Sequence, residues 1–393
     1  MIRFYRLVCI IIFILFTGCS FVASRFIPIN DIKSPTGEYH IGTQIFYWVD
    51  EKRDEWFTPN IKDNRRLMVQ AWYPTTYSNS ETYSWLDYSS DRVESLSENF
   101  KLPKFLVRSI DRVDTDIYIE ATPIRDKIFP IVIFSHGFEG FRFQNMTQIQ
   151  ELVSHGYIVF AVDHTYDATL TIFPDGTQIP RAKKYCPNCK GDDFWEVFRP
   201  QIDTRIADII FILNQIEKMK DKRIKTNFSE ALDLDRIGIF GHSFGGGTSL
   251  AVSILDSRIK SCLSLDGWYV PVYPEIYNQE LIQPFLHLGQ TKWDEELNYQ
   301  ILDNILKSNN NIGYKLSLEG AHHYDFTDSP HLSSLASQFN LSSEIDSEEI
   351  LRVTNTAVLG FFDTHLKLTA NNWLEKIKSN KNTIVEKFNS KDE

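Results

Sequence analysis

The feature that most constrains the fold is a series of short segments, from residue 129 onward, that are apolar along their whole length. Six of them are candidate strands: Phe129 to Phe134, Tyr157 to Val162, Ile237 to Phe240, Ile259 to Leu265, Phe285 to Leu288 and Tyr314 to Leu318. Strands that are apolar throughout are typical of a parallel sheet covered by helices on both faces. This part of the chain therefore predicts an α/β fold with a mostly parallel, doubly wound sheet.

Helical patterns alternate with these strands, at about residues 144–154, 201–218, 245–255, 295–307 and 349–366. Two earlier strands, Ile41 to Val49 and Leu67 to Trp72, predict an N-terminal antiparallel hairpin at the edge of the sheet. Hydrophobic residues make up 42% of the 393 residues, enough for one large core. We expect a single domain over residues 34–370 and a solvated or frayed polar tail over residues 379–393, which are rich in Lys and Asn.

One candidate strand runs directly into Gly241-His242-Ser243-Phe244-Gly245, and a helical pattern follows. A strand, a sharp turn and a helix in this order are typical of a nucleophile elbow, in which a serine hydroxyl stands exposed at the start of the helix. The strained turn leaves no room for side chains at Gly241 and Gly245. We therefore interpret Ser243 as a candidate nucleophile.

A serine hydroxyl needs a histidine to accept its proton and a carboxylate to orient that histidine. In an α/β-hydrolase the order along the chain is serine, acid, histidine. Asp266 and Asp294 both follow candidate strands, so either could be the acid. The adjacent His322 and His323 follow the last apolar strand, and periodicity does not separate them. His287 lies inside a candidate strand, where a buried residue is expected.

Five segments, in the same order along the chain, resemble the plasma and intracellular type II family of platelet-activating-factor acetylhydrolases and its bacterial relatives. They are Pro35-Thr36-Gly37-Glu38-Tyr39 with Ile41-Gly42-Thr43; Phe134-Ser135-His136-Gly137-Phe138 with Phe141-Arg142; Gly241 to Gly246; Leu265-Asp266-Gly267-Trp268; and Gly320 to Asp328. The resemblance spans roughly residues 34 to 370. It implies an α/β-hydrolase fold.

The resemblance also implies the roles of two further residues. Asp266 matches the acid of the family, with Asp294 as the alternative. His323 matches the base, with His322 as the alternative. The sequence therefore predicts a Ser243, Asp266 and His323 triad.

An oxyanion hole needs two backbone donors beside the nucleophile. The N–H of Phe244 is one, because it points into the site from the start of the helix. The other must come from the loop after the strand Phe129 to Phe134, and the resemblance implies Phe138.

The resemblance implies a serine carboxylic ester hydrolase that cleaves short or oxidised sn-2 acyl chains of phospholipids through an acyl-enzyme on Ser243. A general short-chain carboxylesterase or a cutinase-like polyester hydrolase is the alternative, because Gly245-Gly246-Gly247 also occurs in such enzymes. A catalytically silent, hydrolase-like binding protein is a third reading, and the presence of all three triad residue types argues against it. We expect no metal or organic cofactor.

The charge pattern bears on the class of partner. The formal net charge is -11, and basic residues are scattered among acidic ones. A protein that binds nucleic acid usually gathers basic residues into a patch that can neutralise phosphates. The sequence therefore predicts no nucleic-acid partner.

The N-terminus predicts export. Arg3 and Arg6 precede a short apolar run, Leu7 to Phe16, and Thr17-Gly18 lead to Cys19. This pattern is typical of a lipoprotein signal peptide over residues 1–18, with Cys19 as the lipid-modified first residue of the mature protein. An ordinary signal peptide or an uncleaved anchor is the alternative. We expect a lipid-anchored protein of the cell envelope, in contact with a membrane surface, or a periplasmic or secreted one.

Two cysteines form a Cys-Pro-Asn-Cys pair at Cys186 and Cys189. In an exported protein the simplest interpretation is a local disulfide. A metal site would need two more ligands nearby, and the sequence has no second such pair.

Overall fold

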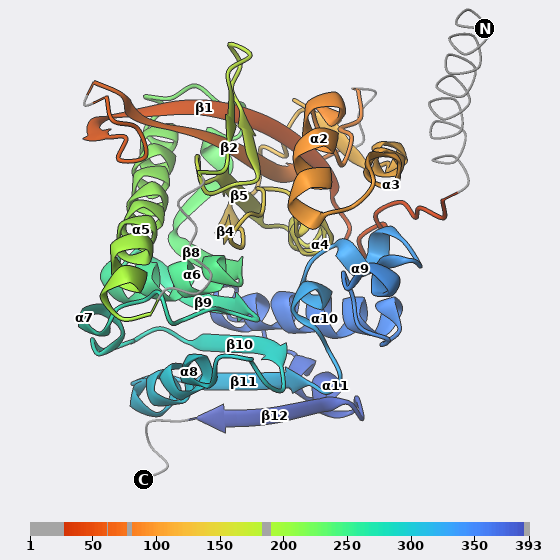
Figure 1. The fold of residues 1–393 in the computed structure, drawn as a ribbon, viewed down its shortest axis with the longest axis vertical. Helices are drawn as coiled ribbons and strands as arrows, with labels where there is room; N and C mark the ends of the chain where they lie inside the picture. The colour runs from red at the N-terminus through yellow and green to blue at the C-terminus, as the bar shows by residue number, and fades with distance from the viewer. Residues whose placement is uncertain (1–26, 61, 77–80, 183–189, 389–393) are drawn as a thin grey trace, which may run out of the picture.

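The computed structural model describes residues 27–60, 62–76, 81–182 and 190–388. A ten-stranded sheet runs through the molecule in the order β12-β11-β10-β9-β8-β4-β5-β2-β1-β3 (Figure 1). Its strands are β1 (His40–Asp54), β2 (Asn64–Thr75), β3 (Ile117–Ile119), β4 (Phe129–Ser135), β5 (Ile158–Asp163), β8 (Leu232–His242), β9 (Ile259–Leu265), β10 (Phe285–Gln290), β11 (Gly313–Leu318) and β12 (Thr383–Phe388). A small sheet joins β6 (Leu170–Ile172) to β7 (Gln178–Pro180).

The six strands predicted from residue 129 onward are β4, β5, β8, β9, β10 and β11, and each pairs in parallel with its neighbours in this set. Their side chains point alternately to two apolar clusters. Ile131 and Ile133 of β4 belong to one cluster, whereas Val132 and Phe134 belong to the other. Because both faces of the sheet are covered, most residues of these strands are apolar or small, which explains the apolar runs in the sequence.

Helices cover the two faces. On one face lie α4 (Met146–Ser154), α10 (Ser347–His365) and α11 (Trp373–Lys378), and on the other lie α5 (Asp192–Lys220), α6 (Phe244–Leu255), α7 (Pro274–Tyr277) and α8 (Glu296–Ser308). The remaining helices are α2 (Ser89–Phe100), α3 (Lys104–Ser109) and α9 (Ser329–Leu332), with short 3-10 turns η1 (Ile110–Arg112), η2 (Ser229–Ala231), η3 (His323–Phe326) and η4 (Ala336–Phe339). This arrangement confirms the predicted doubly wound α/β fold.

The predicted hairpin is present as β1 and β2, which pair in an antiparallel register from His40 with Thr75 to Asp54 with Asn64. Strand β2 joins the parallel part of the sheet by pairing antiparallel with β5. The hairpin is not the outermost element, because the short strand β3 pairs along β1. That strand has only three residues, too few to show a pattern in the sequence.

The expected polar tail is wrong over residues 383–388. These residues form β12, which pairs antiparallel with β11 along the edge of the sheet. Val385 and Phe388 are partly buried against the two apolar clusters, whereas Glu386 and Lys387 are exposed. The charged side chains that suggested a solvated tail are exposed on an edge strand, where charges discourage pairing with other molecules.

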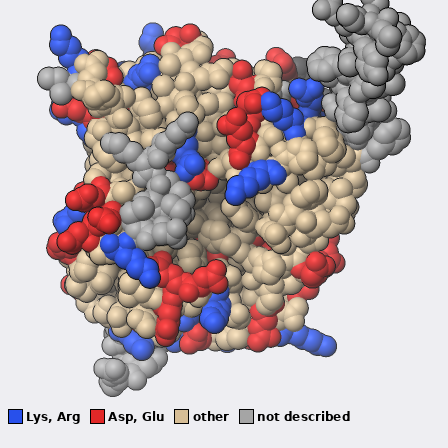
Figure 2. All heavy atoms as spheres, in the orientation of Figure 1, with Lys and Arg blue, Asp and Glu red and all other residues tan. Residues whose placement is uncertain are grey.

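On the face drawn in Figure 2, basic and acidic side chains lie in small mixed groups separated by uncharged areas. That face has no continuous basic stripe, which agrees with the charge pattern of the sequence. Among the residues that the structure describes, no helix is both long and apolar enough to cross a bilayer.

Candidate active site

The strand-to-helix turn at Ser243 has the geometry of an elbow. Strand β8 ends at His242 and α6 begins at Phe244, so Ser243 alone forms the turn. Its φ of 55° and ψ of −121° lie outside the regions that serine normally adopts, a conformation that typically costs about 1–3 kcal/mol. Besides the bonds from Gly246 and Gly247 of the helix to Ser243 O, two backbone bonds hold the turn to the next strand and the loop after it: Ser243 N–H donates to Leu265 O at 3.0 Å, and Trp268 N–H donates to Ser243 O at 2.8 Å.

The two glycines of the elbow have no space for a side chain. A Cβ on Gly245 would lie 1.9 Å from the carbonyl oxygen of Ser135, and a Cβ on Gly241 would lie 2.3 Å from the backbone of Gly245. Both obstacles are main-chain atoms, so a side chain could be fitted only by moving the strand and the helix apart.

Asp266 and His323 come together although 57 residues separate them. Asp266 follows β9, His323 follows β11 at the start of η3, and His323 Nδ1 lies 2.6 Å from Asp266 Oδ2. The carboxylate is fully buried, whereas the His323 side chain keeps 30% of its surface exposed. Burial alone would raise the pKa of Asp266, but the hydrogen bond and charge of His323 outweigh it and lower that pKa.

Other donors also bind the Asp266 carboxylate. Gln290 donates through its backbone N–H and its Nε2, and Trp293 donates through Nε1, each at 3.0 Å. A carboxylate with this many donors is fixed in place and kept ionised. Sequence reasoning missed both residues. The polar Gln290 at the end of an apolar strand was a usable signal, whereas Trp293 in a loop gave none.

The two alternative residues lie outside this arrangement. The Asp294 side chain is exposed in the loop after β10, and the described residues show no hydrogen bond or ion pair between it and His323. His322 is also exposed, and its backbone N–H donates to Asp325 Oδ2 at 2.8 Å at the start of η3. His287 is fully buried in β10, as expected, and bonds to Tyr269.

One cavity is lined by Ser243 and His323 together with residues of the loop after β4, among them Gly137 and Phe138. The loop lies close to the elbow, because a Cβ on Gly137 would be 3.3 Å from Ser243 Cβ. Phe244 is the first residue of α6, so its N–H has no acceptor within the helix. The structure thus places both predicted oxyanion donors next to the predicted nucleophile.

His242, next to the candidate nucleophile, was also missed. It is buried, and its Nε2–H donates to the carbonyl oxygen of His323 at 3.0 Å while Gln144 Nε2 donates to its Nδ1 at 3.1 Å. Burial, with a smaller contribution from the nearby His323, lowers its pKa to about 3. A neutral His242 therefore holds the loop of His323 without adding a second positive charge.

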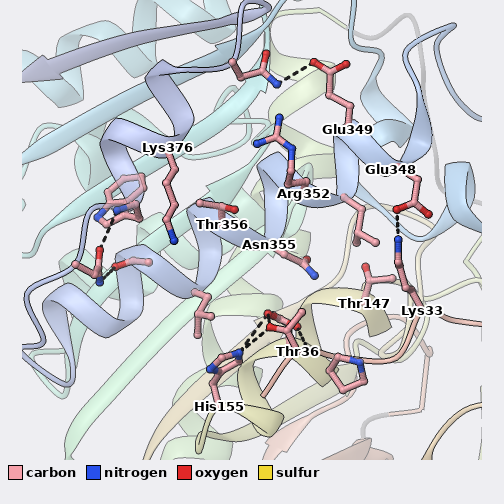
Figure 3. Close-up of a pocket in the computed structure, with 18 of the residues that line it drawn as sticks. Lys33, Thr36, Thr147, His155, Glu348, Glu349, Arg352, Asn355, Thr356 and Lys376 are labelled. Carbon is pink, nitrogen blue, oxygen red and sulfur yellow. Dashed lines mark hydrogen bonds and ion pairs between the residues drawn. The ribbon is translucent and has the colours of Figure 1, made fainter. Parts of the chain in front are cut away.

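A second, apolar cavity adjoins the first and shares part of its lining, including Trp85, Phe100, Phe141 and Leu332. A third groove, larger and polar, lies elsewhere, between α4, α10 and α11 (Figure 3). Its walls carry mixed charges such as the Lys33–Glu348 ion pair and contain no residue of the predicted triad.

The described residues contain no group of His, Cys, Asp and Glu side chains arranged to hold a metal ion. Cys262 is a buried free thiol of β9. Cys19, Cys186 and Cys189 lie outside the described residues, so the lipid anchor and the disulfide stay predictions.

Comparison with known proteins gives the family. A family model described as platelet-activating factor acetylhydrolase, isoform II, matches residues 29–384. The chain belongs to this family. Its relatives include the platelet-activating factor acetylhydrolases of Gallus gallus (28% identity over 270 residues, 61% of this chain and 63% of the relative) and Bos taurus (24% over 331 residues, 78% and 73%). The chain thus spans less than two thirds of the Gallus gallus protein.

A probable 1-alkyl-2-acetylglycerophosphocholine esterase of Arthroderma benhamiae is 27% identical over 271 residues, which cover 66% of this chain and 65% of the relative. Among solved structures, a ferulic acid esterase from Streptomyces cinnamoneus superposes with a TM-score of 0.74 and 25% identity, covering 91% of this chain and 99% of that one. Together these similarities confirm the family resemblance, the α/β-hydrolase fold and the serine esterase class predicted from the sequence.

Proposed function

We propose that this protein hydrolyses the sn-2 ester of phospholipids whose sn-2 acyl group is short or oxidised, through an acyl-enzyme on Ser243. The observation that carries the proposal is the 2.6 Å bond between the buried Asp266 and His323, which lines one cavity together with Ser243. The names of the relatives, acetylhydrolases and a 1-alkyl-2-acetylglycerophosphocholine esterase, support the substrate class.

The mechanism follows from the tautomer of His323. Its Nδ1–H donates to Asp266, which leaves Nε2 unprotonated and able to accept the proton of Ser243 Oγ. The serine oxygen attacks the ester carbonyl, and the N–H groups of Phe138 and Phe244 stabilise the oxyanion. His323 then protonates the leaving lysophospholipid oxygen. Water, activated by the same imidazole, releases the acyl group, so each step uses groups of the chain itself.

The apolar cavity beside the site supports a lipid substrate. It is lined mainly by apolar side chains and shares part of its lining with the catalytic cavity, so the sn-1 hydrocarbon chain of the lipid can lie there while the sn-2 ester is at Ser243. Burying such a chain there is favourable by roughly 0.8 kcal/mol per methylene group.

The test is a panel of phosphatidylcholines with sn-2 chains of graded length, compared with a p-nitrophenyl ester. We expect the rate to fall as the sn-2 chain lengthens and Ser243→Ala to lose at least about 10³-fold in kcat. Ser253→Ala, on the same helix, is the matched control and keeps full activity, since Ser253 donates to Ser249 O within that helix and does not line the catalytic cavity. Equal rates on long and short chains, or cleavage of the aryl ester alone, would overturn the substrate class.

We also propose that Cys19 carries a lipid and that the protein is exported and anchored in the cell envelope. The described chain starts beside the apolar cavity: Arg112 Nη2–H donates to Ile27 O at 2.9 Å, and Ile27 and Ile29 line that cavity. Ile27 lies eight positions after Cys19 in the sequence, a span of at most about 28 Å. A lipid on Cys19 would therefore keep the cavity close to the membrane that supplies the substrate.

Cys19→Ala tests the anchor by membrane fractionation and by labelling with a fatty-acid analogue. We expect the wild-type chain to be labelled and membrane-bound and the variant to be neither. An unlabelled wild-type chain, or a variant that stays in the membrane, would refute the anchor without touching the proposed chemistry.

A further inference from the structure

We infer that Arg205 is a positioning residue that orients and polarises the oxyanion donors. The inference rests on the proposed function, because it concerns the same site. Arg205 lies on α5 and is only 1% exposed. It bonds to the loop after β4 and is absent from the lining of the catalytic cavity.

The guanidinium group binds three acceptors. Nε–H donates to the carboxylate of Asp167, which fixes the charge in place. Nη1–H donates to the carbonyl oxygen of His136 at 2.7 Å, and Nη2–H donates to the carbonyl oxygen of Gly137 at 3.2 Å. Two consecutive peptide groups of the loop are thus held by one planar cation.

The bond to Gly137 acts directly on the donor. The carbonyl of Gly137 and the N–H of Phe138 belong to the same planar peptide group and point in opposite directions. A cation that holds the oxygen therefore fixes the direction of the N–H. It also draws electron density toward that oxygen, which makes the N–H a stronger hydrogen-bond donor.

His136 and Gly140 add two further donors to the same oxygen, and the backbone N–H of Gly140 donates to it at 3.0 Å. His136 Nδ1 lies 2.6 Å from Gly137 O and so carries the proton, while its Nε2 accepts from the N–H of His164 at 3.1 Å. Burial first, and then the charge of Arg205, keep the pKa of His136 well below its ordinary value. The imidazole is therefore neutral. Among the described residues, Arg205 is the only positively charged group bonded to the carbonyl oxygen of Gly137.

Arg205 also contacts the residue that carries the second donor. Its guanidinium carbon lies 4.4 Å from the centre of the Phe244 ring, within the range of a cation–π contact. The rings of Phe138 and Phe244 are 6.3 Å apart. The buried Arg205 side chain therefore contacts both the peptide group of the Phe138 N–H and the ring of Phe244, the two residues that supply the proposed oxyanion donors.

Only arginine can make this set of contacts. A lysine carries its charge at one point and could not reach the carboxylate and both carbonyl oxygens together. We expect Arg205→Lys to lower kcat by about 10- to 100-fold and to leave KM within twofold, because the oxyanion exists only in the transition state. Rates are taken per active site titrated with a fluorophosphonate, so that unfolded protein does not count.

Arg92→Lys is the matched control. Arg92 is also buried, with Nε–H on Asp87 and Nη1–H on the carbonyl oxygen of Leu170, so it loses a similar set of bonds. Arg92 contacts neither donor residue. We therefore expect the kcat of Arg92→Lys to stay within twofold of wild type, even if its thermal stability falls as much as that of Arg205→Lys.

Inhibition by a trifluoromethyl ketone distinguishes an effect on the oxyanion donors from a purely structural effect of the substitution. The hemiketal that this ketone forms with serine carries a charged oxygen that imitates the transition state, so we expect the inhibition constant of the ketone to rise in Arg205→Lys by the same factor by which kcat falls. The affinity for the lysophospholipid product should not change.

If Arg205→Lys does not fold, Asp167→Asn is the second variant. This substitution weakens the ion pair that holds the Arg205 guanidinium but leaves the guanidinium in the protein. We expect a three- to tenfold fall in kcat with KM unchanged. Wild-type kcat and ketone affinity in whichever of the two variants folds would overturn the inference. That result differs from a failure of the proposed function, which would appear as activity retained by Ser243→Ala.

Discussion

At the scale of single residues, the site depends on how each charged group is held. The Asp266 carboxylate receives His323 on one oxygen, Trp293 on the other and Gln290 on both. Such an acceptor fixes the His323 tautomer as firmly as it fixes the position of the ring. The proposed base can therefore present only Nε2 to Ser243.

Asp266→Asn should lower kcat by about 10³- to 10⁴-fold, because an amide in that place favours the wrong tautomer of His323. The measurement is kcat on a short-chain phosphatidylcholine. Asp294→Asn serves as the control and should retain wild-type kcat, since the exposed Asp294 has no bond to His323 in the described chain. A large loss in Asp294→Asn with activity kept in Asp266→Asn would reverse the assignment of the acid.

The sequence indicated some of the residues of the candidate site and gave no sign of others. Ser243 could be selected because its glycines, strand and helix are local. Asp266 and His323 needed the family resemblance, because the choice against Asp294 and His322 depends on contacts between distant segments. Arg205 gave no signal, since a buried arginine on a helix looks like an ordinary surface residue until the loop above it is known.

At the scale of elements, the loop after β4 has to pass close to the elbow. A Cβ on Gly137 would lie 3.0 Å from His242 Nδ1 and 3.3 Å from Ser243 Cβ, and these neighbours would have to shift by a few tenths of an ångström. The loop carries Phe138, so any such shift moves an oxyanion donor. The close contact between this loop and the elbow therefore constrains the position of a proposed oxyanion donor more than it constrains the stability of the fold.

Gly137→Ala should lower kcat by about tenfold or more, because small misplacements of oriented groups cost rate steeply. Its melting temperature should change little. Gly313→Ala is the control: its Cβ would be too close only to the flexible end of Leu306, at 2.8 Å, and its other neighbours lie at ordinary contact distances of 3.5 Å or more. Equal kcat in the two variants would show that the contact between the loop and the elbow tolerates a methyl group.

The element pattern was largely predictable, because buried parallel strands leave unbroken apolar runs. The exceptions were the edge strands β3 and β12. One is too short to form a pattern, and the other is half exposed and carries charged residues, so neither resembles a buried strand.

At the scale of the whole molecule, several histidines are buried without a charge. Burial lowers the pKa of His164, His287, His331 and His365 to about 4 and that of His242 to about 3. In the unfolded chain these groups titrate near 6.5. Between those values the unfolded chain binds more protons than the folded one, so the free energy of unfolding falls as the pH is lowered.

Each such histidine contributes up to about 1.4 kcal/mol per pH unit between pH 6.5 and its folded pKa. We therefore expect urea denaturation to show a steep loss of stability from pH 6.5 to pH 5, and calorimetry to detect the uptake of several protons on unfolding. Stability should be nearly flat from pH 7 to pH 8.5. A flat profile down to pH 5 would mean that these side chains become protonated without unfolding.

The C-terminal strand has a consequence for how the protein is made. The turn that leads to His323 is tied to the end of the chain, because Glu319 N–H donates to Asn382 O at 2.7 Å just before β12. This hydrogen bond can therefore form only after the chain has been synthesised past Asn382. An early stop codon, or a protease that cuts upstream of Asn382, would give a shorter product. That product would retain Ser243 but would lack the hydrogen bond that supports the turn before His323, the proposed base.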